Sequence, residues 1–232
     1  MSDLNNLECH QKPLIIVNFK TVEEGSGHKA IALAKELEDA SSTISDFEIA
    51  LTVQTIDLHQ VACKINLKVF AQHVDPIGYG AFTGGVNPFA VKAVGAAGTL
   101  INHNEKRIPE ERIEEAIRLS KLAGLTVILC ASNIIEAKNF IKYDPDYIAL
   151  EPSDTDVFSS ASLLDLVKQS TAEIDSPRLL FGGGIASYQE VMQIMNEGAS
   201  GIMISSSVVK SNNPNQSLLR LLKQENNVYS NC

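Results

Sequence analysis

The chain is poor in the residues that build redox and metal centres. Among 232 residues there is no tryptophan, and there are four methionines and four cysteines. The cysteines Cys9, Cys63, Cys130 and Cys232 lie far apart, and no two have the close spacing of a metal site. Cys63 and Cys130 stand in apolar runs, where a thiol acts as a small core residue. The cysteines therefore indicate no metal site and suit a reducing compartment.

Positive charge and long hydrophobic runs are also scarce. Lysine and arginine total 19 against 28 acidic residues, a net charge of −9. Nucleic-acid surfaces need clustered basic side chains, so we expect no nucleic-acid partner. No apolar run approaches the roughly 20 residues that span a bilayer, and the N-terminus is polar. We expect a cytoplasmic protein without a membrane partner, although a local positive site could still hold a small anion.

Short apolar segments alternate with amphipathic ones along the whole chain. The segments that we predict as strands are 14–19, 48–53, 68–73, 98–103, 125–132, 147–151, 178–183 and 201–206. Most are apolar at every position, as expected of parallel strands that are covered on both faces. The segments between them have helical periodicity, including 28–40, 108–124 and 187–199.

Eight strand–helix units favour a closed α/β barrel of the (β/α)8 type over an open sheet. At about 29 residues a unit, they fill the chain and leave no room for a linker. We predict one domain at 13–226, with a polar N-terminal extension at 1–12 and a short C-terminal tail at 227–232.

In such barrels the functional groups stand at the carboxyl ends of the strands. The first predicted strand ends in Asn18 and Lys20, and the fourth delivers His103 with Glu105 behind it. The sixth ends abruptly at Glu151. Each of these residues alone could be a solvated charge or a buried imidazole with a partner. Together they make a base, an electrophile and a positive charge, which suit proton abstraction beside a carbonyl.

The last two strand ends carry small residues. Glycines at 182–184 follow the seventh strand, and serines at 205–207 follow the eighth. Their backbone N–H groups could bind a phosphate, which occupies this position in many such barrels. We therefore predict Gly183, Gly184, Ser206 and Ser207 as contacts of a small phosphorylated substrate, with the sugar phosphates as its class.

Three segments, "VNFKT", "FAQHVDPIGYGAFTGGVNPFAVKAVGAAGTLINHNEKR" and "YIALEP", resemble triosephosphate isomerase in its shorter, archaeal form. The resemblance runs from about residue 13 to residue 224. It implies interconversion of dihydroxyacetone phosphate and glyceraldehyde 3-phosphate, without a metal or cofactor. The resemblance also implies the family's mechanism, in which the surroundings of a glutamate and a histidine tune their pKa values. We take that mechanism from the family and do not infer it from the sequence.

The resemblance also implies a role for each residue. Glu151 is the base, and His103 is a neutral electrophile kept uncharged by a helix N-terminus. Lys20 supplies positive charge, Asn18 orients the substrate, and Glu105 supports the site from behind. A sixth residue, Thr83, lies in the loop that reaches a neighbouring subunit in the family, which implies a homodimer or homotetramer.

The sequence departs from the family pattern around the phosphate and the lid. After Glu151 and Pro152 the segment "SDTDVFSSAS" is shorter than the family's lid and has no glycine. Asp154 and Asp156 lie where a phosphate should be enclosed. Asn104 replaces a serine, and the three serines of the eighth loop replace Ala-Ser-Gly. A lid of this kind could close poorly and release the reaction intermediate.

Two other functions stay open from the sequence. The same barrel could act on a different or unphosphorylated substrate, because glycine-rich phosphate loops are shared by many enzymes. It could also be a non-catalytic binding protein, since one fold hosts many functions. The joint presence of Asn18, Lys20, His103 and Glu151 favours the isomerase.

Overall fold

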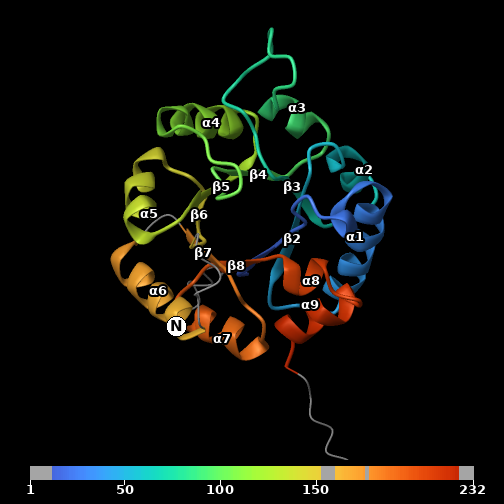
Figure 1. Ribbon diagram of the computed structural model, residues 1–232, viewed down its shortest axis with the longest axis vertical. Helices are drawn as coiled ribbons and strands as arrows, with labels where there is room; N and C mark the ends of the chain where they lie inside the picture. Colours follow the sequence, from blue (N-terminus) through green and yellow to red (C-terminus); the bar gives the residue numbers. More distant parts are fainter. Residues whose placement is uncertain (1–11, 153–159, 176–177, 225–232) are drawn as a thin grey trace, which may run out of the picture.

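The computed structural model describes residues 12–152, 160–175 and 178–224, and the predicted extension and tail fall outside them except for residue 12. Eight parallel strands form a closed barrel in chain order, which confirms the predicted fold. Figure 1 shows the strands at the centre of a ring of helices. The strands are β1 (Leu14–Asn18), β2 (Glu48–Val53), β3 (Lys68–Ala71), β4 (Gly98–Ile101), β5 (Thr126–Ala131), β6 (Tyr147–Leu150), β7 (Arg178–Gly182) and β8 (Gly201–Ile204).

Helices connect consecutive strands and cover the outside of the barrel (Figure 1). The α-helices are α1 (Gly27–Ser41), α2 (Leu58–Ala62), α3 (Pro88–Ala93), α4 (Glu110–Leu122), α5 (Ile134–Phe140), α6 (Ser160–Glu173), α7 (Tyr188–Asn196), α8 (Ser206–Val209) and α9 (Pro214–Leu222). Short 3₁₀ helices occupy Glu23–Gly25 and Ile141–Tyr143. None of the helices in the described part of the chain is long and apolar enough to cross a membrane.

The strands are apolar on both faces because each face packs into a different core. One set of strand residues fills the barrel interior, including Ile16, Phe70 and Leu180. The alternate residues, such as Ile15 and Leu129, pack outward with the apolar stripes of the helices. The period of two along a strand therefore separates two cores, and neither leaves a strand face exposed to water.

Local sequence signals set several of the helix boundaries. The Asn133 side chain accepts a hydrogen bond from Glu136 N at the start of α5, and Ser187 with Glu190 forms a capping box at α7. Gly124 follows the end of α4 with a φ of 78°, a conformation that glycine adopts without strain. Pro109 is the N-cap of α4, so this helix begins at Glu110, two residues after the start of the predicted segment 108–124.

One prediction about the cysteines is wrong. Cys130 is buried in β5 as expected, but Cys63 is exposed. Cys63 caps the end of α2, which has only five residues, so the apolar run around it does not continue into the core.

Candidate active site

The end of β1 places a lysine over the mouth of the barrel. Asn18 is buried, and its side-chain oxygen accepts a hydrogen bond from the Lys20 backbone N–H at 3.0 Å. Lys20 has a left-handed φ of 50°, which is uncommon outside glycine. Strained backbone of this kind is typical of functional sites. The Lys20 ammonium group lies 2.8 Å from Glu105 Oε1, so the predicted supporting carboxylate pairs with the lysine.

The end of β4 fixes His103 through the residue before it. Asn102 has a φ of 63°, and its buried side chain donates to Cys130 O and accepts from Ile108 N. His103 is only 6% exposed, and its Nδ1 accepts the Glu105 backbone N–H at 3.1 Å. In the neutral ring the proton therefore sits on Nε2, the atom that faces the barrel mouth.

The donor that holds His103 comes from a turn and not from the helix N-terminus that the resemblance implied. Lys106 N donates to His103 O at 2.7 Å, which closes a turn over four residues, and α4 begins only at Glu110. The tautomer is the same in both arrangements, because one backbone N–H is enough to occupy Nδ1.

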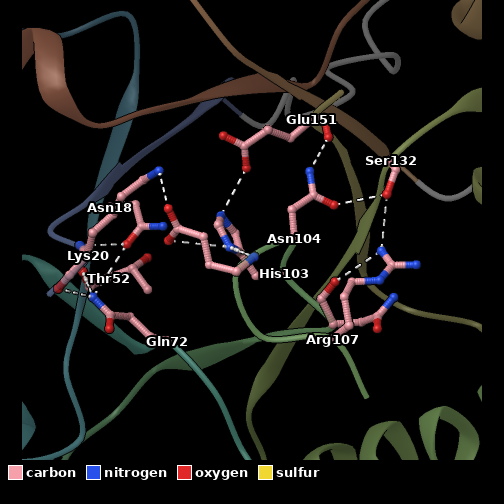
Figure 2. A network of polar contacts seen from close by, with 11 residues as sticks. Asn18, Lys20, Thr52, Gln72, His103, Asn104, Arg107, Ser132 and Glu151 are labelled. Carbon is pink, nitrogen blue, oxygen red and sulfur yellow. Dashed lines mark hydrogen bonds and ion pairs between the residues drawn. The ribbon is translucent and has the colours of Figure 1, made fainter. Parts of the chain in front are cut away.

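Glu151 follows β6 and faces His103. Its Oε2 lies 2.9 Å from His103 Nε2 (Figure 2), and the Glu151 side chain is 16% exposed. The two atoms are close without meeting hydrogen-bond geometry, and neither has another partner among the described residues. Buried polar atoms are rarely left in this state unless a site needs them free. The sequence-predicted base and electrophile are thus brought together.

Gly182 of β7 lies beside the Glu151 side chain. A Cβ on Gly182 would lie 3.4 Å from the Glu151 carboxyl carbon, an ordinary contact, and 3.3 Å from Met203 O, which is tighter than usual. The following glycines, Gly183 and Gly184, have φ values of 106° and 68° and open space above them. A side chain at either position would be strained in that conformation.

The residues predicted to bind phosphate lie at the same end of the barrel, after β7 and β8. Ser206 and Ser207 are exposed and form the first turn of α8. Among the described residues, no hydrogen bond or ion pair joins these serines to Lys20 or His103. The lid positions Asp154 and Asp156 lie outside the described residues, so the expectation about lid closure stays a prediction.

Thr83 does not join this cluster within one chain. The connection between β3 and α3 projects beyond the ring of helices (Figure 1), and Thr83 is exposed on it. Thr83 lines a surface cavity with Phe82 and Arg112. Asn18, Lys20 and His103 line a different cavity of about 320 Å³ at the mouth of the barrel.

Sequence reasoning missed Gln72, which follows β3. Its side-chain amide donates to Lys20 O at 2.8 Å and lies 3.4 Å from Asn18 Oδ1, so it holds the strained end of β1 (Figure 2). The signal was present, because Gln72 is a polar residue directly after a buried strand, the position that identified Glu151.

The described part of the chain contains no group of three or more His, Cys, Asp or Glu side chains that could hold a metal. Cys130 lies near the site, but burial, reinforced by the charge of Glu151, raises the pKa of its thiol well above the usual range. The thiol therefore stays protonated and is a packing group.

Comparison with known proteins gives a consistent result. The family profile described as "Triosephosphate isomerase" matches residues 13–145 and ends before β6. Triosephosphate isomerase of Methanosarcina acetivorans is 32% identical over 224 residues, which are 91% of this chain and 98% of that protein. Those of Saccharolobus solfataricus and Methanocaldococcus jannaschii are each 35% identical, over 87% and 90% of this chain and 91% and 99% of theirs.

A crystal structure of triosephosphate isomerase from Bartonella henselae shares the fold, with a TM-score of 0.72. It is 19% identical and covers 92% of this chain and all of that one. The alignments with the archaeal relatives extend over almost the whole length of those proteins, and the family profile covers more than half of this chain. The chain belongs to the triosephosphate isomerase family.

Proposed function

We propose that this protein interconverts dihydroxyacetone phosphate and glyceraldehyde 3-phosphate by proton transfer through an enediolate. The observation that carries the proposal is the pair formed by Glu151 Oε2 and His103 Nε2. They lie 2.9 Å apart at the barrel mouth, and neither has another partner among the described residues. A base beside a neutral N–H donor is what proton abstraction next to a carbonyl requires.

Glu151 acts as the base in this mechanism. A bound triose phosphate enters between the two side chains, so that the carboxylate turns from the imidazole to a C–H bond beside the carbonyl. It takes the proton from one carbon and returns it to the neighbouring carbon. Because the side chain is 16% exposed, the substrate displaces little water from the base.

His103 stabilises the negative oxygen of the intermediate. Its Nδ1 accepts the Glu105 N–H, so Nε2 carries the ring proton and donates a hydrogen bond to the carbonyl oxygen. The same nitrogen can serve both oxygens of the enediolate, one after the other.

Lys20 supplies the positive charge that the anionic substrate and intermediate need. Its ammonium group is paired with Glu105 and is 31% exposed, which leaves part of it open to a ligand in the mouth cavity. Asn18 holds the Lys20 backbone and orients the substrate from the barrel wall. Gly183, Gly184, Ser206 and Ser207 bind the phosphate through backbone N–H groups.

The protein acts as a homodimer or homotetramer in the cytoplasm. Support for the oligomer comes from the projecting β3–α3 connection, where Tyr79 and Phe82 are 76% and 50% exposed. Large exposed aromatic side chains on one loop suit a contact with another chain. Thr83 would then reach the site of a neighbouring subunit.

A coupled assay on the purified protein tests this function. Glyceraldehyde 3-phosphate is the substrate, and both dihydroxyacetone phosphate and methylglyoxal, the product of phosphate loss, are followed. We expect isomerase turnover that is lost in Glu151→Gln. Methylglyoxal as the main product would mean that the segment after Pro152 does not protect the intermediate, and absence of both products would refute the proposed substrate.

A further inference from the structure

The residue after the histidine makes a contact to the base that its position in sequence does not suggest. Asn104 follows His103 at the end of β4, yet its side-chain amide donates a hydrogen bond to the backbone carbonyl of Glu151 (Figure 2). The two residues are 47 positions apart. Asn104 thus links the strand end that carries the electrophile to the strand end that carries the base.

This bond completes the attachment of the Glu151 backbone. Its N–H already donates to Ala131 O at 3.0 Å, across the β5–β6 edge. With its carbonyl held by Asn104, Glu151 has both backbone polar groups fixed, and the next residue, Pro152, has no N–H and a restricted φ. The backbone of the base is therefore held at the point where β6 and its strand-to-strand hydrogen bonds end.

The Asn104 amide is itself held in one orientation. Its Oδ1 accepts a hydrogen bond from Ser132 Oγ at 2.9 Å, so the NH₂ group must face Glu151. The hydroxyl of Ser132 accepts in turn from Arg107 Nη1 at 3.3 Å. Arg107 pairs with Glu136 of α5, which also accepts from Ser132 N at 2.7 Å. A continuous network runs from α5 to the base.

We propose that Asn104 is a positioning residue for proton transfer, acting through the Glu151 carbonyl. The inference rests on the proposed function and deepens it. A base must approach its C–H bond to within a narrow distance, and a displacement of about 1 Å can cost about 100-fold in rate. Asn104 lies outside the set that contacts substrate, so its loss should lower kcat and leave substrate affinity nearly unchanged.

The test compares Asn104→Ala with Asn215→Ala. Asn215 is also a half-buried asparagine whose amide donates to a glutamate backbone carbonyl, Glu36 O at 3.1 Å, but it lies on α9 away from the barrel mouth. We expect Asn104→Ala to lower kcat by about 10- to 100-fold with KM within about twofold. Asn215→Ala should keep both constants within about twofold of the wild type.

A second variant covers the case in which Asn104→Ala folds poorly. Asn104→Asp keeps the size of the side chain and the acceptor for Ser132, but replaces the donor to Glu151 O with an acceptor oxygen. The kcat of Asn104→Asp should fall at least as far as that of Asn104→Ala. Far- and near-ultraviolet circular dichroism on each variant verifies that the comparison is made between folded proteins.

The double variant shows whether Asn104 acts through the base. Glu151→Asp already withdraws the carboxylate by one methylene, so Asn104→Ala should cost clearly less in that background than in the wild type. Full additivity, or wild-type kcat in folded Asn104→Ala or Asn104→Asp, would overturn the inference. Wild-type protein without isomerase activity would refute the proposed function instead, so the two failures are distinguishable.

Discussion

At the scale of single residues, the barrel depends on positions where only glycine fits. Gly201 opens β8 beside Leu14 of β1, the pair that closes the sheet. A Cβ on Gly201 would lie 1.9 Å from Leu14 O, far inside the contact distance of the two atoms. Its φ of 155° also lies in a region that favours glycine. Strand separation at the seam is thus set by the absence of a side chain.

Replacing this glycine should weaken the closure of the barrel. We expect Gly201→Ala to lower the free energy of unfolding by about 2–4 kcal/mol, because the two backbones must move apart. Gly78→Ala is the matched control, since nothing lies within 4 Å of a Cβ there, and it should change stability by less than about 0.5 kcal/mol. Urea unfolding measures both, and equal stabilities would contradict the close approach.

At the scale of elements, the long β3–α3 connection is held at its base by one carboxylate. Asp75 Oδ2 accepts from Val86 N at 2.7 Å, and Asp75 N donates to Val86 O at 2.8 Å, so the two ends of the connection are joined. Asp75 Oδ1 also lies 3.0 Å from His73 Nε2. Burial alone would raise the pKa of Asp75, but the Val86 N–H and the contact with His73 lower it below its ordinary value.

The lowered pKa of Asp75 predicts that its stabilisation of the β3–α3 connection is lost in acid. A carboxyl whose pKa is lower in the folded than in the unfolded state stabilises the fold above its unfolded pKa. That contribution is lost as the pH falls below the ordinary value of 3.8 and through the lowered pKa. Because the side chain is partly exposed, we expect a contribution of about 1 kcal/mol or less.

Two variants separate the charge of Asp75 from its hydrogen bonds. Asp75→Asn keeps an oxygen for Val86 N but has no charge to lose, so its stability should fall less steeply in acid than that of the wild type. Asp75→Ala removes the side-chain hydrogen bond with Val86 N and should be less stable at every pH. Thermal unfolding from pH 3 to pH 7 provides the comparison, and parallel curves for wild type and Asp75→Asn would contradict this assignment.

The elements also show what the sequence could predict. Continuous apolar runs identified all eight strands, because parallel strands with two buried faces have few other sequence patterns. The predicted strand ends then drew attention to the polar residues Lys20, His103 and Glu151, because functional groups in such barrels stand at the carboxyl ends of the strands. Gln72 was missed although its position directly after a buried strand was visible in the sequence, because a side-chain amide carries no charge. The contact of Asn104 was missed because its partner depends on three-dimensional packing. The exposed position of Cys63 was missed because α2 is shorter than its apolar run.

At the scale of the whole molecule, closure of the barrel creates the candidate site. Lys20 follows β1, His103 follows β4 and Glu151 follows β6, so three separate strand ends must converge on one mouth. A parallel barrel places all eight carboxyl ends at the same face, which makes this convergence a property of the fold. The interaction between Glu151 and His103 then depends on the register of the whole sheet.

The proposed function depends above all on Glu151, which carries a proton between two carbons of a triose phosphate. The most direct measurement is isomerisation in deuterium oxide, followed by nuclear magnetic resonance, for the wild type and Glu151→Gln. We expect the wild type to give product in which solvent deuterium replaces part of the hydrogen that Glu151 carries between the two carbons, because the protonated carboxyl can exchange with solvent, and we expect neither product nor exchange from Glu151→Gln. Isomerisation or deuterium exchange at the wild-type rate in Glu151→Gln would contradict this role.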